Sequence, residues 1–295
     1  MSKYYYLVAG LPNLAFDDKK LPYAPSAFKE ELFAHLSSKD ARLFGLFALR
    51  TDNKNLLEHL RQPASWEFQP GGSLTAEAAD HYMELVTQER EGERVSKQAF
   101  SGLPPYLHAF LRLWQESAGE ASPIAWEDRL AALYYAYAMG CKNRFAAEWF
   151  ALNLNVNNTL AALTCRKFGL DRNLYIVGQT AVCEHLRTSN ARDFDLGDQA
   201  EALHLDELLR LADETDLMRR EKAIDQLKWN WLDEATESKV FDFESLLAYY
   251  FKLEMLERWA TLDRETGEQA FRTLVGKMKK GSDKTLDEFK RNNTK

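Results

Sequence analysis

The stretch from Arg144 to Gly169 constrains the fold more than any other part of the chain, because it holds no proline and its only glycine is its last residue. Apolar side chains recur within it at steps of three or four residues, which places them on one face of an α-helix. These residues are Phe145, Trp149, Leu152, Val156, Leu160 and Leu163. The sequence therefore predicts a long core helix that crosses a domain.

The same stretch carries polar side chains that a helix does not need. They are Asn153, Asn155, Asn157, Asn158 and Arg166. Asparagine is a mediocre helix former, because its amide competes for nearby backbone groups. We expect these residues to form a structural motif that hydrogen-bonds to neighbouring helices. The alternative is a core helix whose polar back faces solvent. Neither interpretation makes the group catalytic, since amides neither titrate nor attack.

The other patterns are also helical. Ser122 and Pro123 form a helix start, so residues 123–169 should be an antiparallel helical hairpin. Asp40 is expected to start one helix, and Thr51 or Asp52 to cap the next. Only Tyr4–Val8 has strand character, as a short strand or an arm. We predict an all-α fold, an elongated multi-helix assembly of antiparallel hairpins.

The predicted organisation is one elongated helical domain over residues 1–275, with 1–121 and 122–275 as candidate lobes. Residues 276–295 are basic and have few apolar anchors, so we expect a mobile tail there. No strict repeat of the tetratricopeptide or ankyrin kind is visible.

Composition excludes several classes of protein. The apolar content of 45% is ample for a core, and the formal charge of −7 argues against nucleic-acid binding. Three cysteines at wide spacing are typical of buried thiols in a reducing compartment. No export signal is visible, and the longest uncharged apolar run, 130–141, is too short to cross a bilayer. We expect a cytoplasmic protein without direct membrane insertion.

Motifs for catalysis, cofactor binding or metal binding are scarce. The chain contains no G-x-x-x-x-G-K-[ST], G-x-G-x-x-G, H-E-x-x-H, C-x-x-C or G-x-S-x-G. Glu201 and His204 form one E-x-x-H, but di-iron carboxylate bundles need this half-motif from two helices. We therefore predict no catalytic residue, no cofactor and no metal ion, and we expect that the protein is not an enzyme.

Two tryptophans suggest a surface contact. Trp229 and Trp231 flank Asn230, so on a helix they point to different faces and at least one should be partly exposed. In the simplest interpretation Trp231 completes the core and Trp229 lies on the surface. Exposed aromatic residues dominate many interfaces, so Trp229 is a candidate partner contact. The nearby basic residues Arg219, Arg220 and Lys222 are candidates for electrostatic steering of a partner.

Three segments carry a family resemblance: YYYLVAGLP at 4–12, LNLNVNNTLAALTCRK at 152–167 and FDFESLLAYYFKLEMLERW at 241–259. Together they resemble an uncharacterised bacterial family encoded with V-type ATPase subunits. The last two segments are also distantly similar to the C-type subunits of V/A-type ATPases, which are the d-type subunits of the eukaryotic enzymes. The residues that match the two patterns of that family are Asn155, Asn158 and Arg166, then Leu247, Ala248, Tyr249, Glu254 and Glu257.

The resemblance implies a funnel-like, all-helical subunit without an active site. Its partners would be the central stalk subunits and the membrane rotor ring of the ATPase, and it would lie in the cytoplasm, peripheral to the inner membrane through that complex. The expected function is thus structural, as the part that couples stalk to ring in a proton- or sodium-translocating rotary motor. The alternatives are a free-standing helical adaptor and, with less support, a metal-dependent helical enzyme that uses Glu201 and His204.

Overall fold

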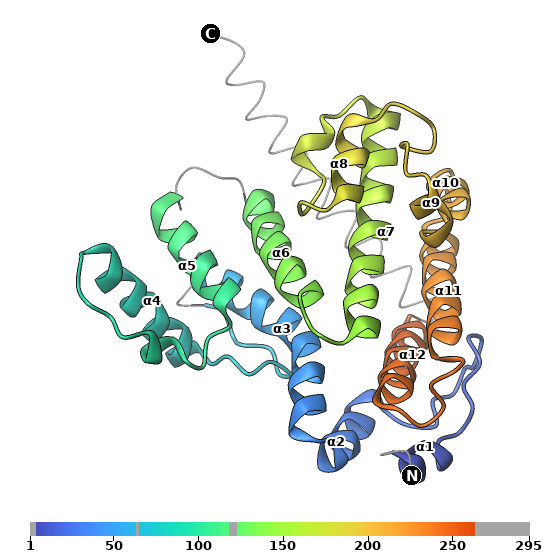
Figure 1. Ribbon diagram of the computed structural model, residues 1–295, viewed down its shortest axis with the longest axis horizontal. Helices are drawn as coiled ribbons and strands as arrows, with labels where there is room; N and C mark the ends of the chain where they lie inside the picture. The colour runs from blue at the N-terminus through green and yellow to red at the C-terminus, as the bar shows by residue number, and fades with distance from the viewer. Residues whose placement is uncertain (1–3, 63–64, 118–122, 263–295) are drawn as a thin grey trace. The chain divides into compact units, whose positions relative to one another are not determined.

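The computed structural model describes residues 4–62, 65–117 and 123–262, which form twelve α-helices, two 3-10 helices and no β-strand (Figure 1). The predicted all-α class is confirmed. The helices are α1 (Tyr5–Ala9), α2 (Pro25–His35), α3 (Ser38–Arg61), α4 (Ala76–Arg90), η1 (Lys97–Phe100), α5 (Pro105–Ser117), α6 (Pro123–Met139), α7 (Arg144–Phe168), η2 (Arg172–Leu174), α8 (Ala181–Thr188), α9 (Asp198–Ala202), α10 (Leu205–Ala212), α11 (Leu217–Thr236) and α12 (Phe243–Thr261).

The chain divides into two compact units. Among the described residues, those between 36 and 231 form one unit, and residues 4–35 with 232–262 form the other. The division does not fall at 121 and 122, where the sequence suggested two lobes. The reason is that α5 and α6, on either side of that point, pack against each other, with the rings of Phe110 and Trp126 edge to face at 5.8 Å. The basic tail at 276–295 lies outside the described residues.

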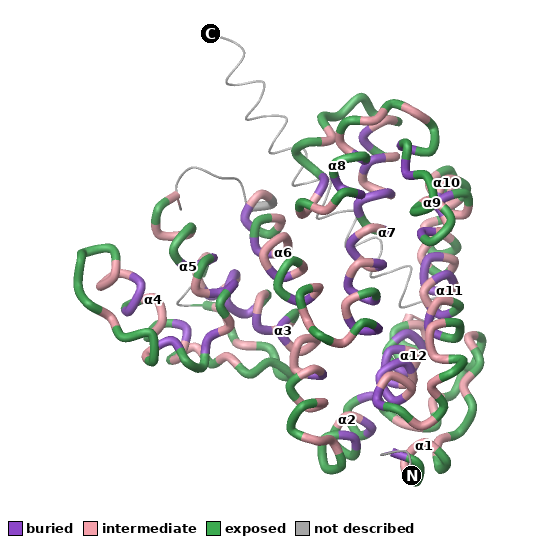
Figure 2. The backbone as a smooth tube through the Cα atoms, in the orientation of Figure 1, coloured by how far each residue is buried: buried purple, intermediate pink, exposed green. Residues whose placement is uncertain are grey.

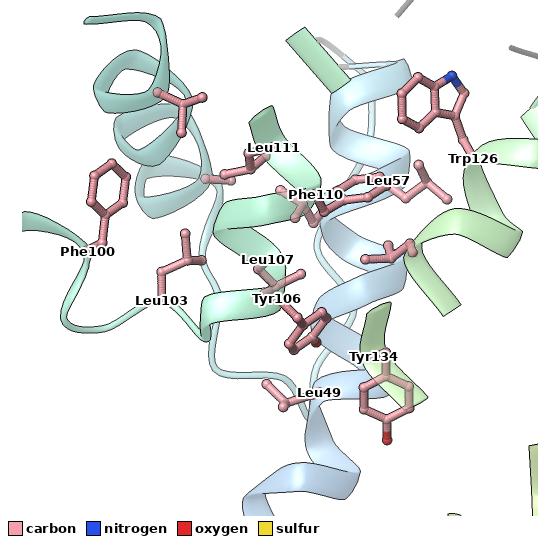
Figure 3. Packing of buried hydrophobic residues seen from close by; sticks show 14 of the residues in the cluster. Leu49, Leu57, Phe100, Leu103, Tyr106, Leu107, Phe110, Leu111, Trp126 and Tyr134 are labelled. Atoms are coloured by element: carbon pink, nitrogen blue, oxygen red, sulfur yellow. The ribbon is translucent and has the colours of Figure 1, made fainter. Parts of the chain in front are cut away.

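In the larger unit, α3, α4, α5 and α6 enclose a shared apolar core (Figure 3). Leu57, Phe110 and Leu111 are almost completely buried at its centre. Two tyrosine hydroxyls find partners at its edge. Tyr134 donates to the Leu46 carbonyl at 3.0 Å, and Tyr106 donates to the Asn53 side chain at 2.5 Å. Both bonds are made to α3, so this helix is fixed by polar as well as apolar contacts.

Helix α7 continues the packing as the second arm of the predicted α6–α7 hairpin. Asn143 caps its start by accepting a hydrogen bond from the Ala146 backbone N–H at 2.9 Å. Gly169 ends it in the left-handed conformation, with φ of 67°, which suits glycine. Helices α8 and α10 also pack against α7. Because it has neighbours on several sides, buried, intermediate and exposed positions alternate along it (Figure 2).

The smaller unit has its own core, in which α12 packs against α2. Leu246, Leu247 and Leu253 of α12 are fully buried. The rings of Phe28 and Tyr249 lie 5.1 Å apart, between the two helices. Helix α12 therefore buries the stripe that its sequence pattern indicates, although it carries charged residues at other positions.

The expected strand at Tyr4–Val8 is wrong: residues 5–9 form helix α1. Val8 donates its backbone N–H to the Tyr4 carbonyl at 3.0 Å, which is a helical bond. A strand must bond to another strand, and the described part of the chain contains none. Helical turns satisfy the backbone locally, so they replace the strand that residue preference alone suggested.

The two helices expected from Asp40 and from Thr51 or Asp52 are one continuous helix, α3. Ser37 caps it, accepting a hydrogen bond from the Asp40 backbone N–H at 3.3 Å. Asp52 does not act as a cap. It is buried in the middle of α3, where its carboxylate accepts hydrogen bonds from the segment before α4.

Within residues 4–62, 65–117 and 123–262, no helix has the length and low polarity that crossing a lipid bilayer requires.

Candidate functional site

Asn158 is the most deeply buried of the predicted motif residues, with 2% of its surface exposed. Its side-chain amide forms a pair of hydrogen bonds with the backbone of Val177. The Nδ2 atom donates to the Val177 carbonyl at 2.7 Å, and Oδ1 accepts from the Val177 N–H at 2.9 Å. Nδ2 also lies 3.3 Å from Sγ of Cys183. Asn158 therefore joins α7 to the irregular segment before α8 and to α8 itself.

Arg166 joins α7 to the segment after α8. Its guanidinium donates to the carbonyls of Ser189 and Ala191, at 2.9 and 2.7 Å. It also lies over the ring of Phe194, with its central carbon 3.5 Å from the ring centroid, which is cation–π geometry. Burial, and then the nearby cation of Arg172, lower the pKa of Arg166 from its ordinary value. The side chain remains charged, because arginine titrates far above neutral pH.

The other three asparagines do not join this arrangement. Asn153 donates to the Trp149 carbonyl of its own helix at 2.8 Å. Asn155 is half-buried, and its Oδ1 atom is buried without a hydrogen-bond partner. Asn157 is exposed. Asn158 and Arg166 thus bond mainly to irregular segments on either side of α8, where the sequence predicted bonds to neighbouring helices, and Asn153, Asn155 and Asn157 form no common site with them.

The basic candidate partner contacts on α11 differ in how far they are exposed. Arg219 and Lys222 are exposed and Arg220 is half-buried. Arg219 lies 3.5 Å from the Asp216 carboxylate in an exposed ion pair.

Trp229 is buried, with 4% of its surface exposed, so the prediction that it lies on the surface is wrong. Trp231 is the half-buried one, with its ring 5.4 Å from Phe145 and 5.6 Å from Trp149. Helix periodicity places the two tryptophans on different faces but does not determine which face is more deeply covered.

Glu201 and His204 do not lie on one continuous helix. Glu201 is in α9, whereas His204 follows that helix and precedes α10, with a left-handed φ of 52°. The i, i+3 side-chain geometry of the di-iron half-motif depends on an unbroken helix. In the part of the chain that the structure describes, no three His, Cys, Asp or Glu side chains gather as a metal-binding group.

Asp52 on α3 is a polar site that the sequence did not reveal. Its carboxylate is 1% exposed and accepts three hydrogen bonds. They come from the backbone N–H groups of Ser73 and Leu74, at 2.7 and 2.8 Å, and from the Ser73 hydroxyl, at 2.9 Å. The backbone at Gly72 approaches so closely that a Cβ atom there would overlap the carboxylate. Asp52 thus holds the connection to α4 against α3.

Two further residues extend this polar face of α3. Asn55 pairs with the Gln69 backbone, donating to its carbonyl at 3.0 Å and accepting from its N–H at 2.8 Å. Nε2 of His59 lies 2.7 Å from the Asp80 carboxylate on α4. The spacing of 52, 55 and 59 is the helical i, i+3, i+7 pattern, which is the available sequence signal. Interpreting Asp52 as a helix cap conceals that pattern, because it places a helix boundary inside α3.

A surface cavity of about 540 Å³ lies at the ends of α4 and α5. Its charged lining combines Arg90, Arg94 and Arg112 with Glu89, Glu93 and Glu116. Gln115, which also lines the cavity, donates to the Met83 carbonyl at 3.1 Å and to the Thr87 hydroxyl at 2.6 Å. Ligand pockets are mostly apolar with a few polar groups. The balanced charges of this cavity favour a solvated surface hollow over a small-molecule site.

Comparison with known proteins gives the chain a family. No curated protein and no solved structure matches it. A family model described as "Protein of unknown function (DUF2764)" matches residues 1–282, which is nearly the whole chain. The chain belongs to this DUF2764 family.

Proposed function

We propose that this protein is a non-catalytic structural subunit of a bacterial V/A-type ATPase, where it couples the central stalk to the membrane rotor ring. The observation that carries the proposal is the resemblance of residues 152–167 and 241–259 to the C-type subunits of these enzymes. The first of these segments lies within α7, and most of the second lies within α12. The two segments that carry the resemblance are thus parts of long helices.

The way in which α7 is held supports a mechanical role. A helix of its length extends for about 38 Å, so a bend or slip at its end would be transmitted along the unit. Asn158, in the second half of α7, and Arg166, near its end, bond the helix to the backbone of residues 177–191. These hydrogen bonds are made within the protein and join its segments to one another. A part that transmits torque needs this kind of stiffness between its packed helices.

The proposed partners are the central stalk subunits and the membrane rotor ring, and the proposed location is the cytoplasmic face of the inner membrane. Arg219 and Lys222 are the candidate partner contacts that the structure leaves exposed. Charged residues at the edge of an interface mainly steer association, so their contribution would be to the rate of assembly. Trp229 is not part of the proposed contact, because it is buried.

Affinity capture from the native cell tests the proposal. The full chain carries a tag at its chromosomal locus, membranes are solubilised in mild detergent, and co-purifying proteins are identified by mass spectrometry. We expect the stalk and rotor subunits of the ATPase in proportion to the tagged chain. Capture of an unrelated set of proteins in their place would contradict the coupling role and would favour the free-standing adaptor.

A charge-reversal pair sharpens this experiment. Replacing Arg219→Glu and Lys222→Glu should slow the assembly of the complex several-fold at low salt. The matched control is Lys54→Glu with Lys97→Glu, two exposed lysines elsewhere in the same unit. Equal effects of the two pairs would remove the α11 contact from the proposal without affecting the capture result.

A further inference from the structure

We draw no further inference here: the strongest candidate, the exposed apolar patch within residues 168–175 at the end of α7 and around η2, carries nothing, because the cations beside it are engaged within the chain and nothing in the described structure shows what covers it.

Discussion

Helices α3 and α7 are both long, and both hold an irregular segment through polar side chains, but they do so with opposite chemistry. On α3, the Asp52 carboxylate accepts hydrogen bonds from the N–H groups of Ser73 and Leu74. On α7, the Arg166 guanidinium donates to the carbonyls of Ser189 and Ala191. The segment before α4 directs backbone N–H groups toward α3, and the segment after α8 directs backbone carbonyls toward α7. Each helix supplies the group that the segment beside it lacks.

The two helices also share one kind of contact, in which an asparagine side chain pairs with a backbone residue. Asn55 on α3 and Asn158 on α7 each bond to both the N–H and the carbonyl of one backbone residue, Gln69 and Val177 respectively. A side-chain amide carries a donor and an acceptor at the spacing of a peptide group, so it replaces the partner strand that such a segment would otherwise need. The comparison teaches that asparagine is used where both backbone groups face inward, and a charged residue where only one kind does.

The largest expected difference between the two regions appears at alkaline pH. Burial raises the pKa of Tyr106 and of Tyr134, both of which donate to α3. A raised folded pKa means that the stabilising effect of the neutral phenol is complete below the unfolded pKa of about 10 and is lost as pH rises above it. Above about pH 10 the free energy of unfolding should therefore fall as pH rises, by up to about 1.36 kcal/mol per pH unit for each of the two groups.

Urea unfolding followed across this pH range provides the measurement. Tyr134→Phe should reduce the alkaline loss, because it removes one of the phenols whose pKa burial raises. Arg166→Lys on α7 should leave the slope unchanged. If both variants kept the full slope, the alkaline sensitivity would not come from the tyrosines at α3.

Asp52→Ala is expected to destabilise the larger unit by about 3 kcal/mol, because it leaves two backbone N–H groups and a hydroxyl without the acceptor that Asp52 provides. Asp52→Asn keeps one acceptor oxygen and the same shape, so it should cost about 1 kcal/mol. Denaturant titration gives both values. A cost for alanine no greater than that for asparagine would show that the three bonds contribute little, and the contrast with α7 would fail.

Asn158→Ala should cost about 2 kcal/mol, since it removes the acceptor of the Val177 N–H and one donor to the Val177 carbonyl. The neighbouring Asn157→Ala is the matched control and should change stability by less than about 0.5 kcal/mol, because Asn157 is exposed. Asn55→Ala should reduce stability by about as much as Asn158→Ala, because both asparagines bond to the N–H and the carbonyl of one backbone residue. Similar values for positions 157 and 158 would refute the assignment of the motif to Asn158.

The smallest expected effect is that of Arg166→Lys, about 1 kcal/mol. Lysine keeps the charge but cannot reach two carbonyls in a plane while it stacks on Phe194. Arg192→Lys is the control at an exposed position in the same segment and should be neutral. Thermal unfolding of the two variants resolves this difference. If Arg166→Lys is as neutral as the control, the planar geometry of the guanidinium contributes nothing to the junction.

Much of the fold is predictable because it depends on local sequence. The stripe from Phe145 to Leu163 and the Gly169 stop define α7, and α6 begins at Pro123, where the sequence predicts a helix start. Predictions fail where a local signal has two meanings. Aromatic residues at 4–8 suit a strand, but α1 forms because no partner strand exists in the described chain. Asp52 suits a helix cap, but it lies in the middle of α3, where its carboxylate accepts a hydrogen bond from the connection before α4.

The sequence by itself determined that residues 144–169 form a helix, that glycine ends it, and that the described chain is built from helices, because periodicity and helix-breaking residues act over a few positions. Only the tertiary structure decided that Asn158 is buried while Asn157 is exposed, and that Trp229 is covered more deeply than Trp231. The physical reason is that a helix fixes the angles between its own side chains, whereas burial depends on which neighbouring segment covers each face. Those neighbours are brought in by contacts distant in sequence, such as that between Asn158 and Val177.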